Sequence, residues 1–147
     1  MARRPMAWVG AIVLLAEAVG IALLNWFLGL VVDNQDMSLA GLDPHAMSVS
    51  TWIAGALFGG YLALCALTLA RTAVRDRAPG TFGRTLLISC AVVHGVLGAL
   101  TVGLVGWAAF AFMMVVLGLI VLPLVAYERK AQQSQSQPLL STSATTP

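Results

Sequence analysis

Residues 85–127 read TLLISCAVVHGVLGALTVGLVGWAAFAFMMVVLGLIVLPLVAY, and His94 is the only acidic or basic side chain among them. The run is about twice as long as the ~20 apolar residues with which one helix crosses a bilayer. Strands of a membrane barrel would alternate apolar and polar residues, which this run does not do. It therefore predicts two transmembrane helices, over about residues 85–105 and 107–127. The residues that mark the reversal between them are Gly103, Gly106 and Trp107.

Two further apolar stretches precede this run, over about residues 6–32 and 49–70. Of the 147 residues, 59% are hydrophobic and 10% charged, whereas about a quarter of the residues of a soluble domain are charged. The composition excludes a sizeable water-soluble catalytic domain. A net charge of +2, without basic stretches interleaved with aromatics, excludes a nucleic-acid binder. The predicted fold is all-α, a transmembrane four-helix bundle over residues 1–130.

The cations predict the orientation of these spans. They lie before the first span, between the second and third, and after the fourth: Arg3, Arg4, Arg71, Arg75, Arg77, Arg84, Arg129 and Lys130. The loop between the first two spans carries Asp33, Asp36 and Asp43 and no cation. Because loops rich in Lys and Arg stay in the cytoplasm, both termini are predicted to be cytoplasmic in a bacterial plasma membrane. The Gln-, Ser- and Thr-rich residues 131–147 predict a disordered polar cytoplasmic tail.

Turn and packing signals complete the predicted fold. Asp43 followed by Pro44 predicts a helix start, with Asp as the N-cap. Small residues let transmembrane helices approach closely, and here they recur at four-residue spacing in two spans. They are Gly55 and Gly59 in the second span, and Ala91, Gly95, Ala99 and Gly103 in the third. Packing within one bundle is the favoured interpretation, and a dimerisation or sliding surface is the alternative.

Three polar residues inside the predicted spans are candidate functional residues: Glu17, His94 and Asn25. Ionisable groups at this depth are costly, so each is a functional hypothesis. At helical rise, Glu17 and His94 both lie ~15 Å from the same side of the membrane. They either share a proton as a neutral pair or are satisfied separately by backbone or hydroxyl groups. Asn25 lies about 80° around the helix from Glu17 and is expected to hold helices together.

The sequence predicts neither a metal site nor a cofactor. Its two cysteines, Cys65 and Cys90, form no CxxC or zinc spacing. One histidine within the spans does not supply two axial ligands for a haem. The chain also has no nucleophile–base set and no phosphate-binding loop. It is therefore predicted not to be an enzyme.

The first span resembles the first helix of the small multidrug resistance exporters. The residues that carry the likeness are Trp8, Ala11-Ile12, Ala16-Glu17-Ala18-Val19-Gly20 and Leu23-Leu24-Asn25. That family also has four spans, and a glutamate in the first exchanges protons for lipophilic cations. The resemblance, which covers the first span alone, implies that Glu17 is the carboxylate shared by proton and substrate.

The whole chain is similar to a group of uncharacterised small integral membrane proteins of actinobacteria. The segments that carry this resemblance are Val31-Val32-Asp33, Met37-Ser38-Leu39-Ala40-Gly41-Leu42, Val93-His94-Gly95-Val96-Leu97-Gly98 and Trp107. The resemblance implies a bacterial plasma membrane and no particular activity.

The hypothesis favoured by the sequence is a non-enzymatic accessory or scaffold subunit of a membrane assembly. Its expected surroundings are the lipid bilayer and either a membrane-protein partner or further copies of the chain, with no nucleic acid. The alternative is a proton-coupled exporter of lipophilic cations that works through Glu17.

Overall fold

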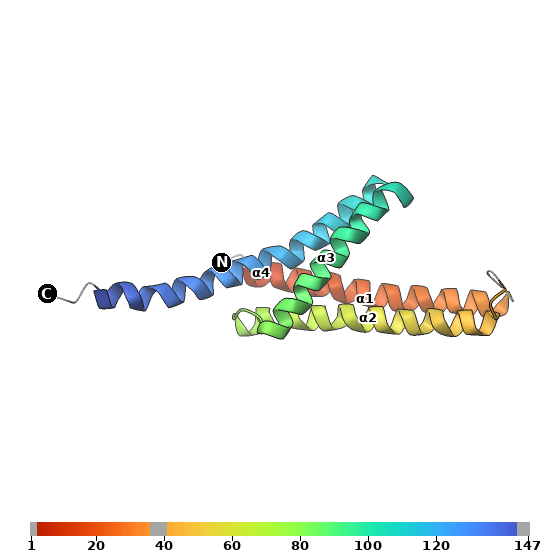
Figure 1. Cartoon of the computed structure of the whole chain (residues 1–147), viewed down its shortest axis with the longest axis horizontal. Helices are drawn as coiled ribbons and strands as arrows, with labels where there is room; N and C mark the ends of the chain where they lie inside the picture. Colours follow the sequence, from red (N-terminus) through yellow and green to blue (C-terminus); the bar gives the residue numbers. More distant parts are fainter. Residues whose placement is uncertain (1–2, 36–40, 144–147) are drawn as a thin grey trace. The chain divides into compact units, whose positions relative to one another are not determined.

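The computed structural model describes residues 3–35 and 41–143 and is helical nearly throughout (Figure 1). Its elements are α1 (Arg3–Asn34), α2 (Pro44–Arg75), α3 (Thr81–Leu104) and α4 (Trp107–Ser143). Each contains a segment long and apolar enough to cross a membrane. The prediction of an all-α protein with four such helices is confirmed, and the chain is an integral membrane protein.

The predicted start of the second membrane helix is confirmed at Asp43. A carboxylate oxygen of Asp43 accepts a hydrogen bond from the Ala46 N–H at 3.1 Å. The Asp43 carbonyl accepts the Met47 N–H, also at 3.1 Å. The first N–H groups of a helix have no partner inside it, and Asp43 supplies one, while Pro44 occupies the first helical position and has no N–H to satisfy.

The reversal between α3 and α4 falls at Gly106, as its sequence predicts. The N–H groups of Val105 and Gly106 both donate to the Thr101 carbonyl, at 2.9 and 2.8 Å. Gly106 has a φ of 115°, a conformation that a residue with a Cβ adopts only with strain. Helix α4 begins at the next residue, Trp107, whose ring packs edge-to-face on Phe110 at 6.0 Å between centroids.

Several helices extend beyond the predicted spans. Helix α2 begins at Pro44 and ends at Arg75, outside the apolar stretch 49–70 on both sides. The apolar run of α4 ends at Tyr127, but the helix continues through Ser143 into the segment for which the sequence predicts a disordered tail. Hydropathy locates the part of a helix that suits lipid, whereas Gln and Ala favour helix in water as well.

The chain divides into two compact units. The hairpin unit is Ile12–Ala66, and the terminal unit is Met1–Ala11 together with Leu67–Pro147. In the hairpin unit, α1 and α2 run side by side (Figure 1). A Cβ added to Gly55 would lie 2.5 Å from the Asn25 Cβ, and one added to Gly59 would lie 3.1 Å from the Ala18 carbonyl oxygen. The two helices are therefore in close backbone contact at these glycines.

The loop end of this hairpin carries a pair of tryptophans. The rings of Trp26 and Trp52 stack with 5.7 Å between their centroids. The Trp52 indole N–H also donates to the Trp26 carbonyl at 3.1 Å. Stacking and the hydrogen bond together tie α1 to α2 near the loop that joins them.

In the terminal unit, α3 packs against α4. The buried residues of α3 are Leu87, Cys90, His94 and Gly98. A Cβ added to Gly98 would lie 2.8 Å from the Met114 side chain, so this glycine is a close contact between the two helices. The N-terminal turns of α1 belong to the same unit, where Ala7, Ala73 and Tyr127 form a small buried core.

Candidate functional site

Glu17 lies in the middle of α1, in the hairpin unit. Its side chain is half-buried, and the carboxyl oxygen Oε1 is fully buried. The residues beside it in sequence are the exposed Ala16 and the buried Ala18. The carboxyl group of Glu17 thus lies in the middle of an apolar helix, far from both of its ends.

His94 is buried in α3, with 4% of its surface exposed. Its Nδ1 lies 2.9 Å from the Cys90 carbonyl oxygen one turn earlier and 3.6 Å from the Cys90 sulfur. In the neutral tautomer that donates to this carbonyl, Nδ1 carries the hydrogen and Nε2 is an acceptor. A backbone group of its own helix therefore binds this imidazole, as one of the two interpretations of the sequence requires.

The proposed pairing of Glu17 with His94 involves both units of the chain. Glu17 belongs to the hairpin unit and His94 to the terminal unit. The shared proton therefore stays a prediction.

Asn25 contributes to the contact between α1 and α2. Its side-chain amide donates to the Ile21 carbonyl at 2.9 Å, within its own helix. Its Cβ and Cγ atoms lie against Gly55 of α2. Asn25 thus contacts the second helix by packing, while its amide hydrogen bond is local.

The small residues predicted for helix packing occupy different surroundings. Gly55 and Gly59 lie in the contact between α1 and α2. A Cβ added to Gly95 would lie 3.8 Å from a Leu117 methyl, and one added to Gly103 would meet nothing within 4 Å. On the same face, Ala91 is half-buried and Ala99 exposed.

The glycine of α3 in close contact with α4 is Gly98, which the sequence did not predict. It follows His94 by four residues, so the two share a face of the helix. Ionisable residues in spans almost always face the protein interior. The position of His94 was therefore the available signal for the buried face of α3, rather than the regular spacing of Ala91, Gly95 and Ala99.

A set of charged contacts joins the helices of the terminal unit near the ends of their apolar runs. Arg84 pairs with Glu128 at 2.8 Å. Lys130 pairs with Asp76 at 2.8 Å. Arg4 of α1 donates to the Ala73 carbonyl at 3.1 Å and to the Val74 carbonyl at 3.2 Å. Carbonyls in the last turn of a helix have no partner within it, so Arg4 satisfies two of them at the end of α2.

Helix α2 ends at Arg75, and Asp76 is the first residue of the loop that follows. Its φ is 48°, in the left-handed region that often ends helices. The hydrogen bond from Lys130 lowers the pKa of the Asp76 carboxyl below its usual value of 3.8, and the charges of Lys130 and Arg4 act in the same direction. Desolvation opposes this lowering of the pKa, and the Tyr127 hydroxyl adds to it. Asp76 is therefore held as a carboxylate.

These ion pairs were not predicted, because they join residues far apart in sequence. Asp76 and Lys130 are 54 residues apart. A signal was nevertheless present: Asp76 and Glu128 are acids that stand among the cations at the ends of the predicted spans. Isolated acids in such loops favour pairing with the surrounding cations.

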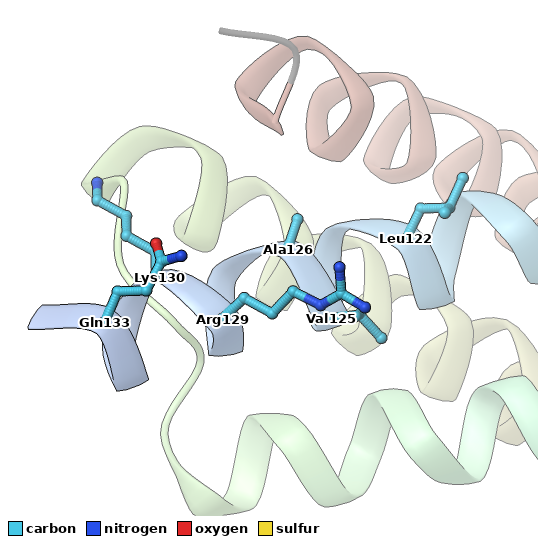
Figure 2. Close-up of a pocket in the computed structure, with 6 residues that line it drawn as sticks. All are labelled: Leu122, Val125, Ala126, Arg129, Lys130 and Gln133. Atoms are coloured by element: carbon cyan, nitrogen blue, oxygen red, sulfur yellow. The ribbon is translucent and has the colours of Figure 1, made fainter. Parts of the chain in front are cut away.

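An exposed face of α4 carries a groove of about 420 Å³. Lys130, a member of one of these ion pairs, is among the residues that line it. Figure 2 shows the residues that line it, which are Leu122, Val125, Ala126, Arg129, Lys130 and Gln133. In this view the Arg129 side chain extends back along α4 toward Val125, and Lys130 extends in another direction. The groove is therefore aliphatic at one end and cationic at the other.

The described residues contain no group of three or more His, Cys, Asp or Glu side chains that could hold a metal ion. No family model matches the chain, and neither a curated protein nor a solved structure is similar to it. Function must therefore be argued from the helices and their contacts alone.

Proposed function

We propose that the protein is a non-enzymatic accessory or scaffold subunit of a larger membrane assembly. The observation that carries this proposal is the division of the glycines in the hairpin unit into two kinds. Gly55 and Gly59 lie in the contact between α1 and α2, whereas a Cβ added to Gly20 or Gly60 would meet no described atom within 4 Å. Gly20 lies about 200° around α1 from Ala18, a residue that contacts α2.

Glycine within a helix is about 1 kcal/mol less favourable than alanine. At Gly55 and Gly59 the close approach of α1 offsets this cost. At Gly20 and Gly60 no described atom lies close enough to offset this cost. A helix of another subunit that packed against these glycines would offset it. Close backbone approach at small residues is the means by which transmembrane helices associate in lipid, where no hydrophobic force between helices is available.

A catalytic role fits the described residues poorly. The thiol of Cys90 lies near the His94 imidazole, which is the residue pair that a cysteine nucleophile uses. Both side chains are buried, and Cys90 has 0% of its surface exposed. A substrate would have to displace the packing between α3 and α4 to reach the sulfur, so we assign this contact to the interior of the protein.

Co-purification from native membranes in mild detergent tests the proposal. We expect a partner in a fixed stoichiometric ratio to the wild-type chain. Gly20→Leu should lower that ratio severalfold, because the added side chain blocks close approach to the open face. The control is Val19→Leu at the neighbouring residue, which is 52% exposed and should retain the partner.

Neither variant should melt below the wild-type temperature, because neither residue lies in a tight contact. Failure to recover any stoichiometric partner with the wild-type chain would overturn the proposal. Equal retention of the partner by Gly20→Leu and Val19→Leu would overturn the assignment of the contact to this face.

The alternative function is proton-coupled export of lipophilic cations, and the buried Glu17 carboxyl is the observation in its favour. An exporter of this kind releases protons when a lipophilic cation displaces them from the carboxylate. We expect no proton release when tetraphenylphosphonium is added to the reconstituted protein. Release that Glu17→Gln abolishes would replace the scaffold proposal with the exporter.

We further propose that the chain lies in a bacterial plasma membrane with both termini in the cytoplasm. The distribution of the eight Lys and Arg residues supports this orientation, because such residues are retained on the cytoplasmic side. The resemblance to small actinobacterial membrane proteins supports the same location.

A further inference from the structure

We propose that the groove on α4 binds an anionic phospholipid, whose phosphate is held by Arg129. Each residue that lines this groove lies three or four positions from another of the set, and the set therefore occupies one face of the helix. They are Leu122, Val125, Ala126, Arg129, Lys130 and Gln133. This inference goes beyond the accessory role and depends only on α4 crossing the membrane.

The order of side chains along the groove matches the order of groups in a phospholipid. Leu122 and Val125 are exposed by 55% and 38% and offer aliphatic surface to an acyl chain. Arg129 follows Leu122 by ~10 Å at helical rise. The apolar run of α4 ends at Tyr127, two residues before Arg129, so Arg129 lies at the level where the hydrocarbon region gives way to the phosphates. Gln133 lies one turn farther out and offers its amide to the polar part of the head group.

Charge favours a lipid with net negative charge over a zwitterionic one. Arg84 is paired with Glu128 and Lys130 with Asp76. In the part of the chain that the structure describes, no acidic side chain pairs with Arg129, which is exposed. The groove therefore carries one uncompensated positive charge. A guanidinium binds phosphate through two parallel hydrogen bonds, which a lysine does not.

The arrangement of the Arg129 side chain fits this role. Long side chains on a helix point back toward its N-terminus, and Figure 2 shows the Arg129 guanidinium extending in that direction, toward Val125. The guanidinium therefore stays near the aliphatic part of the groove instead of reaching away from the membrane. A phosphate bound there leaves the acyl chain of the same lipid beside Leu122 and Val125.

Lipid binding is measured by native mass spectrometry of the full chain, titrated with phosphatidylglycerol or phosphatidylcholine. We expect wild-type protein to retain phosphatidylglycerol in preference to phosphatidylcholine. Arg129→Gln should weaken phosphatidylglycerol binding about tenfold, since a hydrogen bond to a charged group contributes ~1.5–3 kcal/mol. Arg129→Lys should fall between the two, because it keeps the charge and loses the bidentate geometry.

The matched control is Arg77→Gln, which removes the same charge from an exposed residue of the loop between α2 and α3. This variant should bind phosphatidylglycerol as the wild type does. Glycerophosphoglycerol, which has the same phosphate and head group without acyl chains, should not compete at the same concentration, nor should inorganic phosphate. Equal losses in Arg129→Gln and Arg77→Gln would overturn the proposal, because they would show attraction by net charge alone. Unchanged binding by Arg129→Gln, or full competition by inorganic phosphate, would overturn it as well.

Discussion

The hairpin unit and the terminal unit hold their helices together by different means. In the hairpin unit, α1 and α2 meet at Gly55 and Gly59 and at the stacked pair Trp26 and Trp52. In the terminal unit, the pairs Arg84–Glu128 and Lys130–Asp76 and the donation from Arg4 to carbonyls of α2 join the helices near the ends of their apolar runs. Lipid supplies no hydrophobic force between helices, so helices surrounded by lipid must approach each other closely to associate. At the end of an apolar run, water lowers the cost of desolvating a charge, and ion pairs can form there. Substitutions at the glycines of the hairpin unit should therefore act through sterics, and those at the ion pairs of the terminal unit through charge and pH.

The largest effect is expected at the glycine contact of the hairpin unit. Gly55→Ala places a methyl group 2.5 Å from the Asn25 Cβ, and overpacking of this kind costs about 1–3 kcal/mol. Gly60→Ala makes the same chemical change on the same helix, where nothing lies within 4 Å. We expect thermal unfolding in detergent to show a lower melting temperature for Gly55→Ala than for Gly60→Ala. Equal melting temperatures would show that the steric account of this unit is wrong.

A second prediction asks whether the two units are coupled through Glu17 and His94. If they share a proton, Glu17→Gln and His94→Leu each leave a buried polar group without its partner, at a cost of ~1–3 kcal/mol. The double variant removes both groups and should lose less stability than the sum of the single losses. The melting temperatures of the four proteins measure this difference. Additive losses would mean that the residues do not touch and that the two units are independent at this depth.

The smallest effect is expected at the exposed pair of the terminal unit. Since Lys130 lowers the pKa of the folded-state Asp76 carboxyl below its usual value of 3.8, the folded protein binds fewer protons there than the unfolded protein. The resulting stability is present above pH 3.8 and is lost as the pH falls through the lower, folded-state pKa. Lys130→Gln should therefore flatten the dependence of melting temperature on pH below about 4. Arg77→Gln, which removes a cation of the adjacent loop, should leave it unchanged, and a wild-type slope in Lys130→Gln would contradict the pairing.

Sequence reasoning predicted the elements whose signals are local. The length of the run from residue 85 to 127 required two helices, and Gly106 supplied the turn because its φ of 115° suits glycine. Asp43 with Pro44 predicted a helix start because the N-cap hydrogen bond spans three residues. In each case the interacting groups are neighbours in the chain.

The contacts that were missed depend on how helices are rotated or on which distant residues meet. Hydropathy is nearly uniform around α3, so it did not distinguish the face of Gly98 from that of Gly95. The pair of Asp76 with Lys130 required knowing that the end of α2 lies beside α4. The helix ends beyond the apolar windows were missed because the hydropathy that locates a span falls away before the helix stops.

The proposed function and the lipid site both depend on these helices crossing the membrane, and the proposed location of the termini depends on the number and direction of the spans. A reporter enzyme that is active only outside the cytoplasm, fused after Pro147 or inserted near Gly41, measures them directly. We predict that the fusion after Pro147 is inactive and the insertion near Gly41 is active, with both proteins present in equal amounts in the membrane. An active reporter after Pro147 would contradict the account, because the C-terminus would then lie outside the cytoplasm and either the even number of spans or their orientation would be wrong.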